Sequence, residues 1–146
     1  MFRRKAAAVR AAAKLAAQQS GDEVASAMRY LAPSDKANLR RSIRVEDATS
    51  VKLAGQSRAA YASRQGNQSA RDSTNRTADF IGVLIRAGDT STLVPGARNT
   101  LFQNARLQEF GTQSMPANPF FFPAWRANRS RVRSKLTRAV KNAWVK

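Results

Sequence analysis

The sequence predicts an α+β fold for a single domain over residues 1–146, with a long N-terminal helix, a small antiparallel or mixed sheet of about three to four strands and a basic C-terminal helix. Three observations predict this class: alanine-rich, proline-free sequence at the start, short strand-like runs in the middle, and apolar residues at helical spacing at the end. A chain of 146 residues has room for one hydrophobic core and little more.

The N-terminal helix is expected over Lys5–Leu31, because strong helix formers fill this stretch and proline is absent until Pro33. The helix should end before Pro33, since the residue preceding a proline is disfavoured in the α region. Ser20–Glu23 matches a capping box, which leaves two alternatives: two helices, or one long helix with a weak point at Gly21. We favour a continuous or kinked helix.

The middle of the chain is expected to supply the strands. Residues 42–53 alternate loosely between apolar and polar side chains, and residues 79–87, DFIGVLIRA, are short, β-branched and aromatic. A turn at VPGARN leads to a further candidate strand over residues 101–110. Residues 55–78 hold almost no large apolar side chain, so we expect a mobile loop there, or an arm that orders only on a partner.

The C-terminal helix is expected over Pro123–Lys146, because one stripe of apolar residues recurs at helical spacing and proline is tolerated in a first helical turn. The stripe comprises Trp125, Val132, Leu136, Ala139, Val140 and Ala143. The remaining surface of this helix is basic and carries no acidic residue. A purely solvated face usually mixes charges of both signs, so we favour contact with a polyanion over solvation alone. The candidate contact residues are Arg126, Arg129, Arg131, Arg133 and Arg138.

Charge narrows the class of partner. The chain has 26 basic and 9 acidic residues and a formal net charge of +17, which draws it towards nucleic acid, an anionic membrane or an acidic protein surface. Charge alone does not choose among the three. If nucleic acid is the partner, the lack of a recognised reading motif indicates phosphate contact without sequence readout.

Composition argues against catalysis. The chain has no cysteine and no histidine, so the commonest general base and the commonest metal ligand are missing, and a nucleophilic mechanism would need a Ser-Lys or Thr-based arrangement. Its nine acidic residues are scattered, and it contains no glycine-rich phosphate loop. We therefore predict no catalytic, cofactor-binding or metal-binding residue. The apolar runs are also far shorter than the roughly 20 residues that a membrane-spanning helix needs.

The segment EFGTQSMPANPFFFPAW, residues 109–125, is unusually apolar for such a basic chain. It contains five of the nine Phe and Trp residues and three of the five prolines. Its aromatic residues are clustered rather than interleaved with basic ones, so we interpret them as core or interface residues and not as base-stacking platforms. The expected core residues are Phe110, Phe120 and Trp125. Phe121 and Phe122 cannot both point inward from an extended stretch, so one of them is expected to anchor a subunit interface.

Two segments together resemble a family, the head-tail joining or tail-completion proteins of long-tailed DNA phages, which include the gene-ten-like and lambda Z-like minor tail proteins. In LAPSDKANLRRSI the matching residues are Ala32, Pro33, Asp35, Leu39, Arg40, Ser42 and Ile43, whereas Ala37 stands where that family usually has glycine. In EFGTQSMPANPFFFPA the matching residues are Glu109, Phe110, Gly111, Thr112, Met115, Pro116, Ala117, Pro119, Phe120, Pro123 and Ala124.

The resemblance implies a structural virion protein without catalytic residues or cofactors. Such a protein assembles as a ring, usually a hexamer, and its neighbours are the head connector or stopper and the tail terminator or tube. The implied location is the neck or tail of the virion, after assembly in the host cytoplasm, with no membrane. A ring in a DNA conduit could present Arg126, Arg129, Arg131 and Arg133 to genomic DNA or to an acidic neighbouring subunit.

Three residues of the second segment have expected backbone roles. Gly111 would let the chain turn out of the last strand, and Pro116 and Pro119 would hold an extended path across the sheet.

One alternative function stays open. A free-standing, sequence-nonspecific nucleic-acid-binding protein would explain the net charge equally well.

Overall fold

The computed structural model describes residues 2–33, 37–48, 81–96 and 100–145. Asp35 and the loop predicted at 55–78 lie outside the described residues. The elements follow in the order α1 (Phe2–Leu31), α2 (Ala37–Arg41), β1 (Arg44–Asp47), β2 (Val83–Arg86), the 3-10 helix η2 (Thr90–Thr92), β3 (Leu93–Pro95), β4 (Leu101–Gln103), α5 (Asn104–Phe110) and α6 (Phe121–Val145). The predicted α+β class, with a long helix at each end of the chain, is confirmed.

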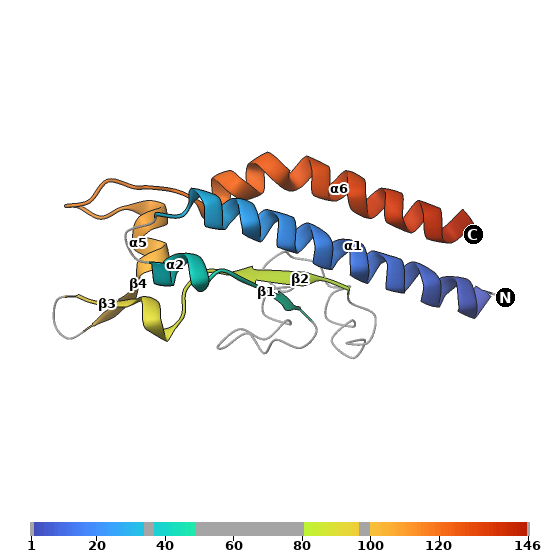
Figure 1. Cartoon of the computed structure of the whole chain (residues 1–146), viewed down its shortest axis with the longest axis horizontal. Helices are drawn as coiled ribbons and strands as arrows, with labels where there is room; N and C mark the ends of the chain where they lie inside the picture. Colours follow the sequence, from blue (N-terminus) through green and yellow to red (C-terminus); the bar gives the residue numbers. More distant parts are fainter. Residues whose placement is uncertain (1, 34–36, 49–80, 97–99, 146) are drawn as a thin grey trace, which may run out of the picture.

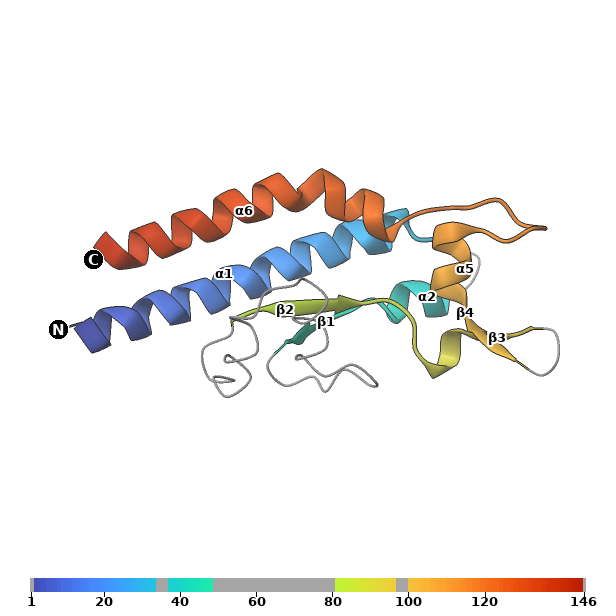
Figure 2. The same cartoon turned by 180° about the vertical axis from the view of Figure 1, so that it is seen from behind.

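The long helix α1 is the middle layer of the molecule. The antiparallel helix α6 packs along one side of α1, and the ribbon formed by β1 and β2 lies along the other (Figures 1 and 2). Both termini therefore lie at one end of the molecule. The second ribbon, α5 and the loop that leads into α6 are gathered at the opposite end.

Helix α1 is continuous, as we favoured, and Gly21 lies within it. A Cβ atom at Gly21 would come within 2.9 Å of Val45 Cγ1 on β1 and 3.1 Å of Val83 Cγ2 on β2. Gly21 is therefore a point of close approach between α1 and the ribbon, and not a break in the helix. The absence of a side chain there lets the ribbon pack directly against the helix backbone.

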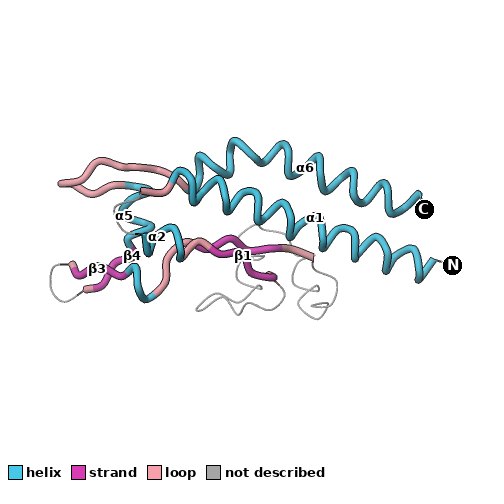
Figure 3. Tube along the Cα trace, viewed as in Figure 1, coloured by secondary structure: helices cyan, strands magenta, loops and turns pink. Residues whose placement is uncertain are grey.

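The prediction of a single sheet of three to four strands is wrong for the part of the chain described. The structure has two separate two-stranded antiparallel ribbons, β1 with β2 and β3 with β4 (Figure 3). Arg44 pairs with Arg86 in the first ribbon, and Leu93 pairs with Gln103 in the second. Between β2 and β3 the chain turns at Gly88, where φ is 101°, and continues through η2. This change of direction separates β3 from the first ribbon.

The predicted strands differ from the observed ones in extent. The strand predicted at 42–53 begins only at Arg44, and its positions from 49 onward lie outside the described residues. Of the strand predicted at 79–87, positions 79 and 80 lie outside the described residues, and the described part forms a strand only over Val83–Arg86. The strand predicted at 101–110 is wrong beyond Gln103, because residues 104–110 form α5. Ala105 and Glu109, four residues apart, are the buried positions of α5, which is a helical period and not the alternation of a strand.

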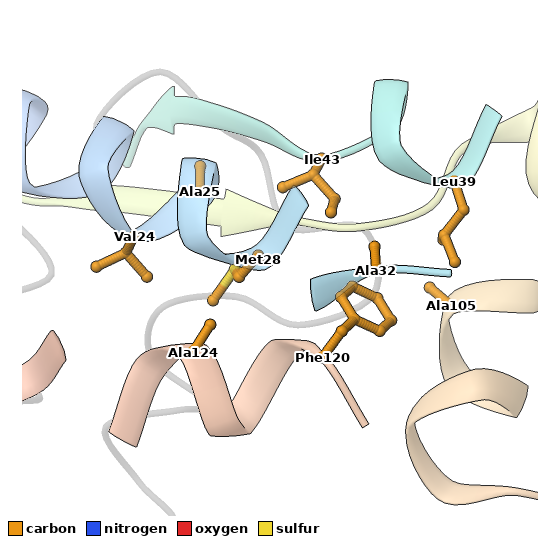
Figure 4. Packing of buried hydrophobic residues seen from close by; sticks show 9 residues of the cluster. All are labelled: Val24, Ala25, Met28, Ala32, Leu39, Ile43, Ala105, Phe120 and Ala124. Carbon is orange, nitrogen blue, oxygen red and sulfur yellow. The ribbon is translucent and has the colours of Figure 1, made fainter. Parts of the chain in front are cut away.

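The core is concentrated where α1, α2 and α6 meet. Phe120 is fully buried and lies among Ala32, Leu39 and Ala105, which come from three different parts of the chain (Figure 4). Towards the middle of α1 the cluster continues through Val24, Ala25, Met28 and Ala124. Burying side chains of this size is worth about 1.5–3 kcal/mol for each large apolar residue. The end of the molecule opposite the termini is thus its best-packed region among the described residues.

Candidate assembly surface and basic helix face

The two segments that resemble the phage family meet in the core. From the first segment, Leu39 and Ile43 are buried and Pro33 is half-buried at the end of α1. From the second segment, Phe120 and Ala124 are buried in the same cluster. Residues about 80 positions apart in the chain therefore stabilise one structural unit, as a domain with a single core requires.

Hydrogen bonds from α1 and from the first segment itself hold this segment in place. The Arg29 guanidinium donates to the Ile43 carbonyl oxygen from Nε at 3.2 Å and from Nη2 at 2.6 Å. Arg40 Nε donates to the Ala32 carbonyl at 2.9 Å. The Ser42 hydroxyl donates to the Leu39 carbonyl and accepts the backbone N–H of Gly88 at 2.9 Å. Arg40 and Ser42 thus stabilise the turn after α1.

Glu109 has the most specific structural role in the second segment. Its side chain is buried, and Oε2 accepts the backbone N–H groups of Phe120 at 2.9 Å and Phe121 at 2.8 Å. Oε1 accepts the N–H of Phe122 at 3.0 Å. These N–H groups have no carbonyl partner within α6, and a negative charge is favoured at a helix N-terminus. Pro123 follows in the first turn, as predicted, where its lack of an N–H is harmless.

Gly111 turns the chain at the end of a helix, which corrects the expectation that it ends a strand. Its N–H donates to the Leu107 carbonyl at 2.7 Å, and its φ is 72° with ψ at −178°. A Cβ atom there would lie 2.8 Å from the Ala117 nitrogen and 2.9 Å from the Met115 carbonyl oxygen. Only glycine fits both this backbone conformation and this space.

Residues 111–120 form a loop that projects from the end of the molecule opposite both termini (Figures 1 and 2). Thr112 N–H donates to the Met115 carbonyl at 2.8 Å, and Asn118 N–H donates to the Gln108 carbonyl at 2.7 Å. Pro116 and Pro119 are exposed in this loop. The expectation that these prolines guide the chain across the sheet is wrong, because the loop extends away from both ribbons.

Of the three predicted core aromatics, only Phe120 is buried. Phe110 is 65% exposed and Trp125 is 42% exposed, so both of those predictions are wrong. Helix α6 already begins at Phe121, and its helical spacing turns Ala124 towards α1 in place of Trp125. Phe110 lies on the outer side of α5, because the neighbouring Glu109 occupies the inner side.

Phe121 and Phe122 separate into one inner and one outer residue. Phe121 packs against the core cluster, whereas Phe122 is 43% exposed. The ring of Phe122 lies 6.2 Å from that of Phe110, measured between ring centroids, and 5.7 Å from that of Phe121. We call Phe110 and Phe122 the aromatic patch. Both are exposed, they come from different helices, and Glu109 holds the backbone between them.

The basic residues of α6 divide into paired and unpaired groups. Glu23 on α1 accepts a hydrogen bond from Lys135 Nζ at 2.7 Å, and Arg131 Nε lies 3.9 Å from the other carboxylate oxygen. The hydrogen bond from Lys135 lowers the pKa of Glu23, and the charges of Lys135 and Arg131 lower it further. Arg131 therefore lies near a carboxylate of α1, although its own side chain is 76% exposed. Among the described residues, no ion pair includes Arg126, Arg129, Arg133 or Arg138, all of which are exposed.

The described residues contain no group of three acidic, His or Cys side chains placed to hold a metal ion. None of the described helices is long and apolar enough to cross a membrane. Comparison of the chain with protein-family models, with curated proteins and with solved structures finds no match. The aromatic patch and the basic residues of α6 without an ion pair among the described residues are therefore the two candidate binding features of this chain.

Proposed function

We propose that this protein is a structural subunit of a tailed-phage virion that assembles with copies of itself into a ring, a hexamer, at the head-tail junction or tail end. The observation that carries the proposal is the aromatic patch. Two neighbouring phenylalanines, 65% and 43% exposed, are a poor arrangement for a chain that stays free in water. Exposed aromatic residues on a rigid support are typical of interface anchors.

The support beneath the patch is rigid for a specific reason. The backbone N–H of Phe122 donates a hydrogen bond to the Glu109 carboxylate, and Phe110 directly follows Glu109 on α5. The position of Glu109 in the second segment therefore has a physical explanation in this chain. Glu109 thus holds the backbone that carries Phe122, next to Phe110, before any partner arrives, and a support that is already formed lowers the entropy lost on association.

A ring also requires that each subunit present two different surfaces, one to each neighbour. The aromatic patch lies at the end of the molecule beside the projecting loop 111–120, and the long side of α6 extends away from it. Because the two ends of the molecule differ, this arrangement suits head-to-tail contacts. In the proposed assembly the ring contacts the head connector or stopper on one side and the tail terminator or tube on the other.

The proposal is tested by measuring the mass of the purified protein by light scattering at about 0.5 M salt, where contacts with phosphate are weak. Wild-type protein should form a closed ring. Phe110→Gln combined with Phe122→Gln should remain folded and be monomeric. Glutamine is chosen over aspartate because a second carboxylate beside Glu109 would disturb the helix cap.

The matched control replaces two exposed apolar residues at the other end of α6, Trp144→Gln with Val145→Gln. This control should still form the ring. A ring that survives loss of the aromatic patch would remove the patch from the interface. A wild-type monomer at high salt that binds DNA at low salt would favour the alternative, a free-standing and sequence-nonspecific nucleic-acid-binding protein, which the unpaired arginines of α6 also support.

A further inference from the structure

One face of α6 forms a shallow, open depression lined entirely by polar and basic side chains. The lining residues are Arg133, Ser134, Thr137, Arg138, Lys141 and Asn142. They recur in adjacent pairs every four positions, which places them on one side of the helix over more than two turns. All six are exposed. This face is distinct from the side of α6 that packs on α1, where Ala124 and Val132 lie.

The charge of this face is not neutralised within the described part of the chain. Helix α6 contains no acidic residue. On α1, Glu23 forms ion pairs with Lys135 and Arg131. Arg133 and Arg138 take part in none of the ion pairs among the described residues, and neither does Lys141. Three like charges held on one helix face repel one another, and an external anion would relieve that repulsion.

The spacing suits a chain of phosphates. Arg133 and Lys141 are eight residues apart, which corresponds to about 12 Å along the helix axis. One strand of B-DNA carries a phosphate about every 3.4 Å along its axis, so the face spans several of them. Ser134, Thr137 and Asn142 add hydroxyl and amide donors between the cations, and side chains of these types commonly bind phosphate oxygens.

We propose that this face of α6 binds the phosphodiester backbone of DNA, without reading its sequence. An anionic membrane surface is less well suited, because the side chains between the cations are polar and short, whereas a membrane-bound helix buries a broad apolar face. The site differs from the one predicted from the sequence. Arg133 and Arg138 belong to both sets and Lys141 is added, whereas Arg126, Arg129 and Arg131 do not line this face.

The inference deepens the proposed function by naming a partner for α6, and it rests on that function only for its biological setting. Ring formation is measured as mass at high salt, and DNA binding is measured at low salt. The two can therefore fail separately. If the protein forms the ring but does not bind DNA, only the inference about α6 is contradicted. If the protein is a monomer that binds DNA through this face, only the proposed ring is contradicted.

The test measures binding to a mixed-sequence duplex of about 15 base pairs, which is longer than α6, at several salt concentrations. The variant combines Arg133→Gln, Arg138→Gln and Lys141→Gln in the full chain. Each phosphate contact contributes about −0.9 to the slope of log affinity against log salt. Loss of three contacts should therefore make the fall in affinity between about 50 mM and about 200 mM salt smaller by ~40-fold for each bound protomer.

The control removes the same charge from exposed residues elsewhere: Arg4→Gln, Arg41→Gln and Arg106→Gln. The control should keep most of the salt slope of the wild type. Equal losses in both triple variants would mean that net charge alone attracts DNA, and would overturn the proposal. Absence of DNA binding by wild-type protein at about 50 mM salt would also overturn it, as would binding to phosphatidylserine vesicles through these residues but not to duplex DNA.

Discussion

The carboxylate of Glu109 on α5 accepts the backbone N–H of Phe122 at 3.0 Å, so an acidic side chain of one helix caps the first turn of another. The same carboxylate accepts the N–H groups of Phe120 and Phe121. One buried side chain thus fixes the angle between α5 and α6 and positions the aromatic patch.

Replacement of Glu109 should therefore destabilise the whole domain. Glu109→Ala leaves three N–H groups without their acceptor and should lower the free energy of unfolding by at least about 2 kcal/mol. Glu109→Gln keeps one acceptor oxygen and should have an intermediate effect. Urea unfolding followed by circular dichroism measures both, and Asp22→Ala, an exposed acid on α1, is the control that should change little. A loss of stability no larger than that of the control would contradict the capping role.

Alanine substitutions of Phe120 and Phe122 should differ strongly in their effect on the free energy of unfolding. Phe120 is fully buried, so Phe120→Ala should cost about 3–5 kcal/mol of unfolding free energy through lost burial and the cavity left behind. Phe122 is 43% exposed, so Phe122→Ala should cost below about 1 kcal/mol in the monomer. Thermal and urea unfolding of the two variants, compared side by side, check this. Similar costs for both would mean that Phe122 is a core residue and not part of an exposed patch.

Gly111 should tolerate no side chain. Its φ of 72° with ψ near 180° lies in a region that is essentially restricted to glycine, and a Cβ atom would lie 2.8 Å from the Ala117 nitrogen. Gly111→Ala should therefore destabilise the protein by about 1–3 kcal/mol. Gly111→Asn should be as harmful, because asparagine tolerates the left-handed helical region but not this one. If asparagine proved nearly neutral in urea unfolding, the turn would have to adopt a different conformation.

Acid should weaken the packing of α6 on α1 through Glu23. The hydrogen bond from Lys135 lowers the pKa of Glu23 below its ordinary value of 4.5 in the folded state. A lowered folded-state pKa means that Glu23 adds stability above pH 4.5 and loses it as the pH falls through the lowered value. The difference in unfolding free energy between wild type and Glu23→Gln should therefore shrink as the pH falls from about 6 to about 3.

The neighbouring Asp22→Asn is the matched control for that measurement, because Asp22 is exposed on the same helix and pairs with none of the basic residues named above. Its difference from the wild type should not follow the same pH course. A difference between wild type and Glu23→Gln that is constant over the acid range would show that the pairing with Lys135 contributes nothing to folding.

The two long helices were predictable because the signals for them are local. Helix formers without proline indicate α1 up to Leu31, and an apolar stripe beginning near Pro123 indicates α6. The segment 104–110 was not predictable as a helix from the alternation of its residues. Its inner positions are Ala105 and Glu109. A glutamate is rarely buried without a partner, and the partners of Glu109 are backbone N–H groups at the N-terminus of α6, a distant part of the chain.

The candidate site was predictable as a region and not as a set of residues. The segment 109–125 was identified as core or interface, and it supplies both Phe120 and the aromatic patch. Which phenylalanine lies inside depends on where α6 begins. The start at Phe121, with Glu109 as its cap, reversed the expected places of Phe110 and Trp125.

Propensity, periodicity and composition are properties of neighbouring residues, and they were enough to predict the α+β class, the helix at each end and the segment in which the aromatic residues gather. The distribution of ion pairs among the cations depends instead on how the helices pack. Glu23 and Lys135 are separated by 112 positions, and their pairing exists only because α6 returns antiparallel along α1. The same packing directs the face with Arg133, Arg138 and Lys141 outward, where the charge has no partner among the described residues.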